Sequence, residues 1–121
     1  INGTVDALKK ITGVEPSSTR PPYGNYNDAT LSLLKNPILL WSVDTLDWKY
    51  RNTNAIIEHA INQIDDGDIV LFHDIYQTSV DASLNMIDEL YKRGYLVMSV
   101  SELVRAKQIT LQPGMKYYHI G

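Results

Sequence analysis

The chain has 121 residues and 44% of them are hydrophobic, enough apolar material for one compact domain with its own core. Its 11 basic and 14 acidic residues give a net charge of −3 at pH 7, and no basic cluster lies on any predicted face, which argues against nucleic acid as a partner. No apolar run approaches the ~18 residues of a membrane span, so we expect none in this chain. The absence of cysteine excludes disulfides and thiolate metal sites.

The N-terminal part of the chain predicts one helix and one short strand. Apolar residues spaced four and three apart indicate an amphipathic helix over residues 1–12, which Gly13 ends. Residues 19–20 read as a short strand. The proline- and glycine-containing segment 21–24 then predicts an extended stretch followed by a turn.

Helical patterns recur along the rest of the chain, with an N-cap at Asn27 or Asp28 for the first of them. In the predicted helix that begins near Ser79, a row of large apolar residues is expected to face inward, and Gly94 ends this helix. The inward residues of that row are Leu84, Ile87, Leu90 and Tyr91. The predicted helices cover residues 27–35, 53–63, 79–93 and 101–107.

Three apolar runs predict strands between these helices. Residues 38–43 are almost continuously apolar, as expected for a strand covered on both faces, and residues 69–72 and 95–100 follow the same pattern. The turn at residues 65–68 connects a helix to the second of these strands, and the tail from Gln108 predicts a turn leading to an edge segment. Because strands alternate with helices, the predicted class is α/β with parallel strands.

Unusual polar residues stand where three of the predicted strands end. They lie in residues 20–24, 44–48 and 71–74, and functional residues of parallel α/β folds collect at such strand ends. Each segment also has a purely structural interpretation. Arg20 can be a solvated side chain, Asp44 and Asp47 can form turns, and His73 can be a structural histidine.

The three segments together resemble the later motifs of the NodB homology domain, the polysaccharide deacetylases of carbohydrate esterase family 4. Arg-Pro-Pro-Tyr-Gly at residues 20–24 resembles the third motif, Asp-Thr-Leu-Asp-Trp at 44–48 the fourth, and Ile-Val-Leu-Phe-His-Asp at 69–74 the fifth. This resemblance covers nearly the whole chain. It implies the C-terminal half of a deformed (β/α) barrel, with parallel strands alternating with helices.

The resemblance also implies roles for individual residues. His73 matches the general acid that protonates the leaving amine, Asp47 the carboxylate that orients this histidine, and Arg20 the arginine that holds the catalytic base. Tyr23 matches the residue whose backbone N–H stabilises the oxyanion. The residues that match the substrate-binding walls are Pro22, Trp48 and Leu71. We expect Arg20, Asp47 and His73 to meet at the carboxyl ends of the strands.

Two motifs of the family are absent from the chain. One is a Thr-Phe-Asp-Asp string with the base and a metal ligand, and the other is a His-x-x-x-His pair of metal ligands. The three histidines, His59, His73 and His119, are far apart in sequence, so we predict no metal ligands within the chain. Residues 1–121 are therefore expected to be the C-terminal part of one NodB homology domain. Its N-terminal part would be a partner that binds a divalent metal, with zinc as the leading candidate.

The function implied by the resemblance is metal-dependent removal of N-acetyl groups from an amino-sugar polysaccharide, with peptidoglycan N-acetylglucosamine as the leading substrate. The chain alone is expected to be inactive. Chitooligosaccharides, acetylated xylan or a non-catalytic carbohydrate-binding module remain alternatives. An extracellular or cell-surface location is expected, with any membrane anchor in upstream sequence. No serine-hydrolase elbow or phosphate-binding loop is present, and residues 65–68 are too short for a calcium loop.

Overall fold

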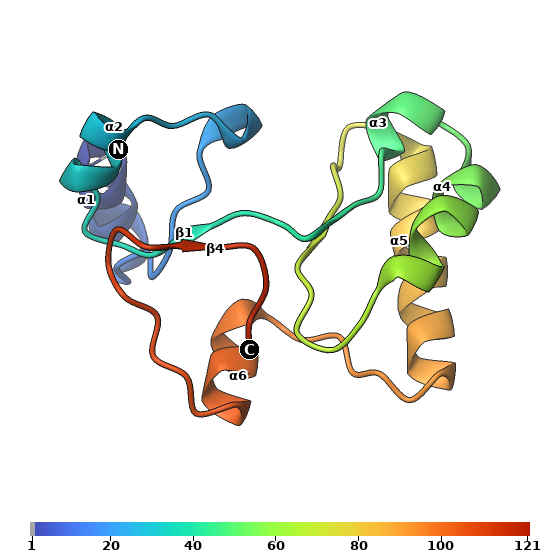
Figure 1. The fold of residues 1–121 in the computed structure, drawn as a ribbon. Coiled ribbons are helices and arrows are strands. Elements are labelled where there is room, and N and C mark those ends of the chain that lie inside the picture. Colours follow the sequence, from blue (N-terminus) through green and yellow to red (C-terminus); the bar gives the residue numbers. More distant parts are fainter. Residues whose placement is uncertain (1) are drawn as a thin grey trace. The chain divides into compact units, whose positions relative to one another are not determined.

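A computed structural model describes residues 2–121 (Figure 1). The chain forms two compact units. The first comprises the described residues up to Leu40 together with Ile109–Tyr118, and the second comprises Trp41–Gln108 with His119–Gly121. No helix in the described range is both long and apolar enough to cross a membrane.

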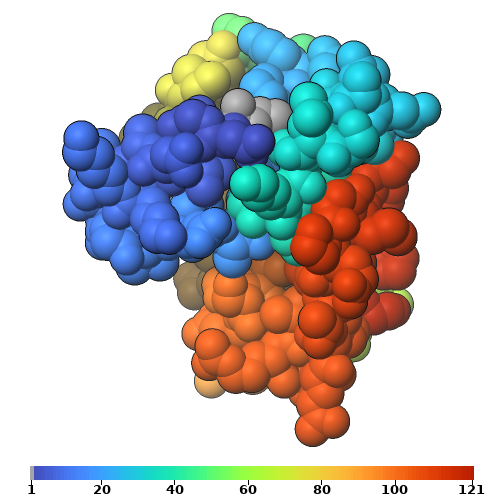
Figure 2. All heavy atoms as spheres, turned by 90° about the vertical axis from the view of Figure 1, so that its left-hand side faces the viewer, coloured from blue at the N-terminus to red at the C-terminus, as the bar shows by residue number. Residues whose placement is uncertain are grey.

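The first unit contains two helices and a pair of short parallel strands. Helix α1 spans Asn2–Thr12 and helix α2 spans Asp28–Leu33, with the 3-10 turn η1 at Pro22–Gly24 between them. Strand β1 (Ile38–Leu39) pairs in parallel with β4 (Lys116–Tyr117), and Thr19 bridges Ile38 in the same sense. Figure 2 shows the red C-terminal segment lying along the cyan segment that holds α2 and β1. The predicted edge segment in the tail is therefore confirmed as β4.

The cap of α2 agrees with the sequence. Asn27 takes an extended backbone conformation, and its side-chain oxygen accepts a hydrogen bond from the backbone N–H of Thr30 at 2.8 Å. This contact satisfies one of the backbone donors that a helix leaves unpaired at its start. Leu34 ends the helix and is buried, whereas Leu31 is partly buried.

The second unit is built around another pair of parallel strands. Strand β2 (Val43–Asp44) pairs with β3 (Val70–Leu71), with Val43 opposite Val70 and Asp44 opposite Leu71. The single strand predicted over residues 38–43 is thus divided into β1 and β2, which pair with different partners. Between them, Ser42 donates a side-chain hydrogen bond to Asp68 at 2.8 Å, so the apolar run is interrupted at its one polar residue.

The second unit also contains helices. They are α3 (Asp47–Tyr50), α4 (Thr53–Ala60) with the 3-10 turn η2 (Ile61–Gln63), α5 (Gln77–Lys92) and α6 (Val100–Ala106). Helices α4 and α5 pack against each other, as Figure 1 shows. The core is formed by buried side chains of β2, α4, η2 and α5, which are Val43, Ala60, Ile61, Met86 and Leu90.

The inward face predicted for α5 is wrong except at Leu90. Leu84 is 58% exposed, and Ile87 and Tyr91 are also exposed. The buried face is formed instead by Ser79, Ala82, Met86 and Leu90. Small side chains in the first two turns suit a close approach to neighbouring segments, so burial follows this row although it is the less apolar of the two.

The strand predicted over residues 95–100 is also wrong for the described chain. Residues 95–99 pair with no described strand, and Val100 already belongs to α6. Ser99 caps that helix, because its hydroxyl accepts from the Glu102 N–H while the Glu102 carboxylate accepts from the Ser99 N–H. Leu96 and Val97 remain exposed. A strand requires a pairing partner, which a local apolar pattern does not supply.

Candidate active site

The segment that leaves strand β2 forms a tight turn that presents Asp47. The Asp44 carboxylate accepts a hydrogen bond from the Leu46 backbone N–H at 2.9 Å, and Leu46 adopts a left-handed conformation with φ of 52°. The Thr45 side chain is fully buried and donates to the Leu71 carbonyl at 2.7 Å, which fixes the turn to strand β3. A left-handed leucine is strained, so the surrounding contacts must hold it in place. Helix α3 then begins at Asp47.

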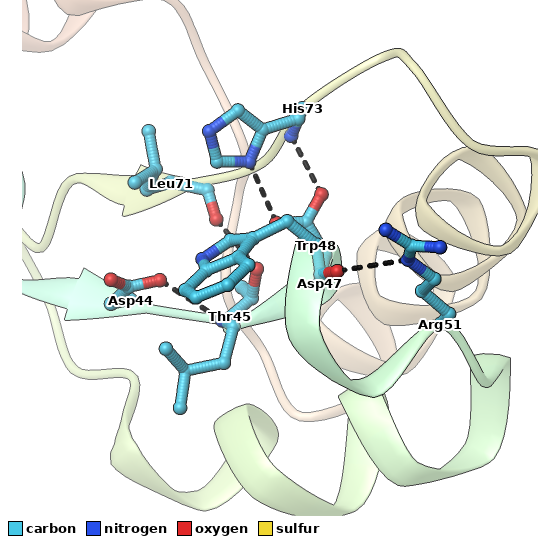
Figure 3. A network of polar contacts seen from close by, with 8 residues as sticks. Asp44, Thr45, Asp47, Trp48, Arg51, Leu71 and His73 are labelled. Atoms are coloured by element: carbon cyan, nitrogen blue, oxygen red, sulfur yellow. Dashed lines mark hydrogen bonds and ion pairs between the residues drawn. The ribbon is translucent and has the colours of Figure 1, made fainter. Parts of the chain in front are cut away.

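Asp47 and His73 form a doubly hydrogen-bonded pair (Figure 3). One Asp47 carboxylate oxygen accepts from the His73 backbone N–H at 2.8 Å, and the other lies 2.8 Å from His73 Nδ1. The Asp47 side chain is fully buried, whereas the His73 side chain is 36% exposed. Because a carboxylate accepts hydrogen bonds, Nδ1 carries a proton in this pair. The other ring nitrogen, Nε2, is left to act on a ligand.

The electrostatics of Asp47 favour the charged carboxylate. Burial alone raises the pKa of Asp47, but hydrogen bonds from the His73 side chain and backbone and a contribution from Ser79 outweigh it, so this pKa lies below its usual value. The carboxylate therefore stays negative at neutral pH. A fixed negative charge beside the imidazole stabilises the imidazolium form and holds the ring in one orientation.

Two fully buried residues, Ser79 and Thr45, lie beside this pair. Neither was among the site residues predicted from the sequence. Ser79 lies in the first turn of α5 with its side chain fully buried. Its hydroxyl makes no hydrogen bond of good geometry within the described residues, yet it lies close enough to Asp47 to lower the pKa of that carboxyl. Thr45 lies within the Asp44–Trp48 motif, and this position could have identified it as a site residue. Nothing in the sequence distinguishes Ser79 from other serines.

The two residues predicted as apolar walls in this unit differ in exposure. Trp48 follows Asp47 directly and is 51% exposed, so its indole ring is available to a ligand. Leu71 is buried in strand β3, two residues before His73. Figure 3 shows both residues around the Asp47–His73 pair. Their roles in substrate binding stay predictions.

The other predicted site residues, Arg20, Pro22 and Tyr23, belong to the first unit. Arg20 donates from Nε to the Leu39 carbonyl at 3.3 Å and from Nη2 to the Leu40 carbonyl at 3.5 Å, which fixes its guanidinium at the end of β1. Pro22 opens the turn η1, and Tyr23 within it has a left-handed φ of 55° and is 94% exposed. Arg20 and the Asp47–His73 pair belong to different units, so their predicted meeting stays a prediction.

Residues 2–121 bring together no group of three histidine, aspartate or glutamate side chains that could hold a metal ion. A catalytic zinc takes about three protein ligands. His73 Nδ1 is already engaged by Asp47, and His59 packs on α4 beside Tyr50, with 5.3 Å between the ring centroids. The described residues therefore do not form a three-ligand metal site by themselves.

Comparison with known proteins gives consistent matches over this chain. The family model described as polysaccharide deacetylase matches residues 1–37. The peptidoglycan-N-acetylmuramic acid deacetylase PdaC of Bacillus subtilis is 44% identical over 89% of this chain and 23% of its own length. The peptidoglycan-N-acetylglucosamine deacetylase PgdA of Listeria monocytogenes is 38% identical over 95% of this chain and 24% of its own length.

Solved structures match the fold as well. The PdaC structure superposes with a TM-score of 0.82 over 89% of this chain and 54% of that chain. A family 4 acetyl xylan esterase from Clostridium thermocellum, solved with a cobalt ion, has a TM-score of 0.88 over 98% of this chain and 60% of that chain, at 23% identity. The chain thus spans between a half and two thirds of these solved domains. These matches confirm the predicted fold class, an α/β portion of a NodB-type (β/α) barrel.

The matches agree with the motifs that end the three predicted strands. Two of those motifs supply the hydrogen-bonded pair of Asp47 and His73, and the third supplies the Arg-Pro-Pro loop of the first unit. The sequence identity to PdaC and PgdA extends over nearly the whole chain. The chain is similar over nearly its whole length to polysaccharide deacetylases of carbohydrate esterase family 4.

Proposed function

We propose that this chain supplies the acid-bearing part of a hydrolase that removes N-acetyl groups from an amino-sugar polysaccharide. The observation that carries the proposal is the pair formed by buried Asp47 and half-buried His73, joined through Nδ1 at 2.8 Å. The similarity to PdaC and PgdA supports the reaction class, since both are named as peptidoglycan deacetylases. Peptidoglycan N-acetylglucosamine is the leading substrate, and chitooligosaccharides and acetylated xylan are the alternatives.

The chemistry requires a proton at the leaving nitrogen. Water adds to the acetamide carbonyl, the C–N bond breaks, and acetate and an amine are released. The amine is a poor leaving group unless its nitrogen is protonated as the bond breaks. In the proposal, His73 Nε2 donates this proton while Asp47 keeps the proton on Nδ1 and stabilises the charged ring. Asp47 is a positioning residue in this scheme, and His73 is the catalytic residue.

The other expected site residues enter the same proposal. Arg20 holds the catalytic base, the Tyr23 backbone N–H stabilises the oxyanion, and Pro22, Trp48 and Leu71 line the substrate site. The exposed indole of Trp48 supports such a role, because aromatic faces pack against sugar rings.

The proposal also includes a partner and a cofactor. Residues 2–121 do not form a metal site, so a divalent metal, with zinc as the leading candidate, would be held by an N-terminal portion of the same domain. Residues 1–121 would then be the C-terminal part of that domain, and the chain alone would be inactive. The peptidoglycan substrates named for the relatives support an extracellular or cell-surface location.

A chimeric domain tests the reaction. The chain replaces the aligned portion of the PdaC deacetylase domain, and acetate release is measured on peptidoglycan fragments, chitooligosaccharides and acetylated xylan. We expect activity in the chimera and a loss on the order of 10²-fold in His73→Ala, since general acid catalysis contributes about that factor. His59→Ala, on α4, is the matched control and should stay active. A folded chimera that is inactive, or one that is indifferent to His73→Ala, would contradict the proposal.

A further inference from the structure

The first unit carries a cluster of tyrosine and lysine side chains beside its parallel strands. Thr19 and Ile38 form a parallel bridge, and β1 pairs in parallel with β4, so these segments all point the same way. Lys116 opens β4 and Tyr118 directly follows it, while Tyr26 lies in the loop after Thr19. Parallel α/β folds bind their ligands beyond the carboxyl ends of the strands, which is where Tyr118 lies.

The cluster consists of Tyr26, Lys116 and Tyr118, which contact one another directly. The hydroxyl oxygens of Tyr26 and Tyr118 lie 3.3 Å apart, and Lys116 Nζ donates to the Tyr26 hydroxyl at 3.3 Å. The ammonium group also lies 4.8 Å from the centroid of the Tyr26 ring, within range of a cation–π contact. These contacts join residues 92 positions apart in the sequence, so the cluster is an organised feature rather than three independent side chains.

The cluster has hydrogen-bonding capacity left for a ligand. Lys116 has three ammonium protons and uses one of them on Tyr26, and the two phenols share a single hydrogen bond. The hydrogen bond to Tyr26 raises the pKa of Lys116, so the ammonium stays charged throughout the neutral range. Lys116 and Tyr118 are both exposed, and Tyr26 is partly exposed. The cluster thus offers a cation beside two aromatic rings in a chain whose net charge is −3.

We propose that Tyr26, Lys116 and Tyr118 form a binding subsite for a carboxylate-bearing sugar of a glycan strand. The ammonium of Lys116 pairs with the carboxylate, and the tyrosine rings and hydroxyls contact the sugar. That the ligand is a glycan rests on the proposed function. The subsite would favour strands with acidic sugars over neutral strands of the same length.

Binding to two matched probes tests the subsite on the 121-residue chain. One probe is a tetrasaccharide of alternating N-acetylglucosamine and N-acetylmuramic acid with free lactyl carboxylates, and the other is neutral chitotetraose. Dissociation constants are measured by NMR titration. We expect the acidic tetrasaccharide to bind about three- to fivefold more tightly, the range of an exposed ion pair. Lys116→Met should abolish this preference and leave chitotetraose binding in place.

Four further measurements make the result specific. Lys10→Met on α1 removes the same charge from the same unit and should keep the preference. Lys116→Arg keeps the charge and should retain most of the preference for the acidic tetrasaccharide. In wild type, the preference should shrink as sodium chloride screens the ion pair. Tyr118→Phe, which keeps the ring and removes the hydroxyl, should weaken binding of both probes.

Two results would overturn the subsite. One is an equal preference in wild type and Lys116→Met, and the other is a preference that persists unchanged at high salt. Because the readout is binding, this test is separate from the test of the reaction. If the chimera is inactive but the chain shows a Lys116-dependent preference, only the proposed reaction is contradicted. If the chimera is active but the chain shows no such preference, only the subsite is contradicted.

Discussion

Asp47 illustrates how a residue type acquires a role only through its surroundings. Taken singly, an aspartate at a strand end is as easily a turn former as a catalytic group, and Asp44 in the same motif does act as a turn former. Asp47 instead is fully buried and accepts two hydrogen bonds from His73. A buried carboxylate with such partners is strongly constrained in position and charge. The motif predicted which residue would be important, whereas the geometry shows which atoms it contacts.

Ser79 gives a prediction at this scale. The Ser79 hydroxyl helps to lower the pKa of Asp47, so Ser79→Ala should raise that pKa. The titration of the Asp47 carboxyl carbon, followed by ¹³C NMR, measures the change. Ser83→Ala on the same helix is the control, because the Ser83 hydroxyl donates to the Val80 carbonyl instead. An Asp47 titration that is identical in wild type and Ser79→Ala would remove Ser79 from the site.

The same substitution has a consequence for acid stability. Folding lowers the pKa of Asp47 from its ordinary value of 3.8, so its charged form contributes stability above that pH. This contribution is lost as the pH falls below 3.8 toward the folded-state pKa. Because Ser79→Ala brings the two pKa values closer together, the variant should lose less stability than wild type across that acidic window.

Among the elements, helix α5 shows what periodicity can and cannot predict. The existence of the helix and its end near Gly94 follow from the sequence, but the inward face does not. Either of two rows of residues on this helix could be buried. One row has large apolar side chains, and the other begins with Ser79 and Ala82. Local periodicity cannot decide between them, because the choice depends on which row allows the closest packing against α4 and the turn that carries Asp47.

Paired truncations on α5 test this assignment. Met86 is only 1% exposed within the core, so Met86→Ala should lower the free energy of unfolding by about 2–5 kcal/mol. Leu84→Ala removes a similar volume from the face that the sequence alone had favoured, and it should cost less than about 1 kcal/mol. Urea denaturation of both variants measures the difference. A larger loss in Leu84→Ala than in Met86→Ala would mean that the helix is rotated from the orientation described.

For the whole molecule, the sequence predicts the class of fold better than the extent of its strands. Parallel strand pairs are present as expected, although β1 is followed directly by β2 and α5 is followed by α6 with no strand between them. The apolar run at residues 95–99 pairs with no described strand. Pairing is a property of two segments, so one segment's composition cannot guarantee it. The matched structures are longer than this chain, which spans 54% of the solved PdaC domain.

The predicted site residues are divided between the two units. Arg20 and the Tyr26 cluster belong to the first unit, and the Asp47–His73 pair belongs to the second. Residues 2–121 gather no metal-binding group. We propose that the activity requires further residues of the same domain, and the chimeric domain supplies them.

Turnover of the chimeric domain, compared between wild type and Asp47→Asn, tests the account most directly. Asparagine keeps the shape of the side chain but removes its charge, and its NH₂ group cannot accept a hydrogen bond from His73. The variant therefore loses one of the two hydrogen bonds that position the His73 ring and backbone, and turnover should fall on the order of 10²-fold. An Asp47→Asn variant with wild-type turnover would contradict the claim that Asp47 positions a catalytic His73.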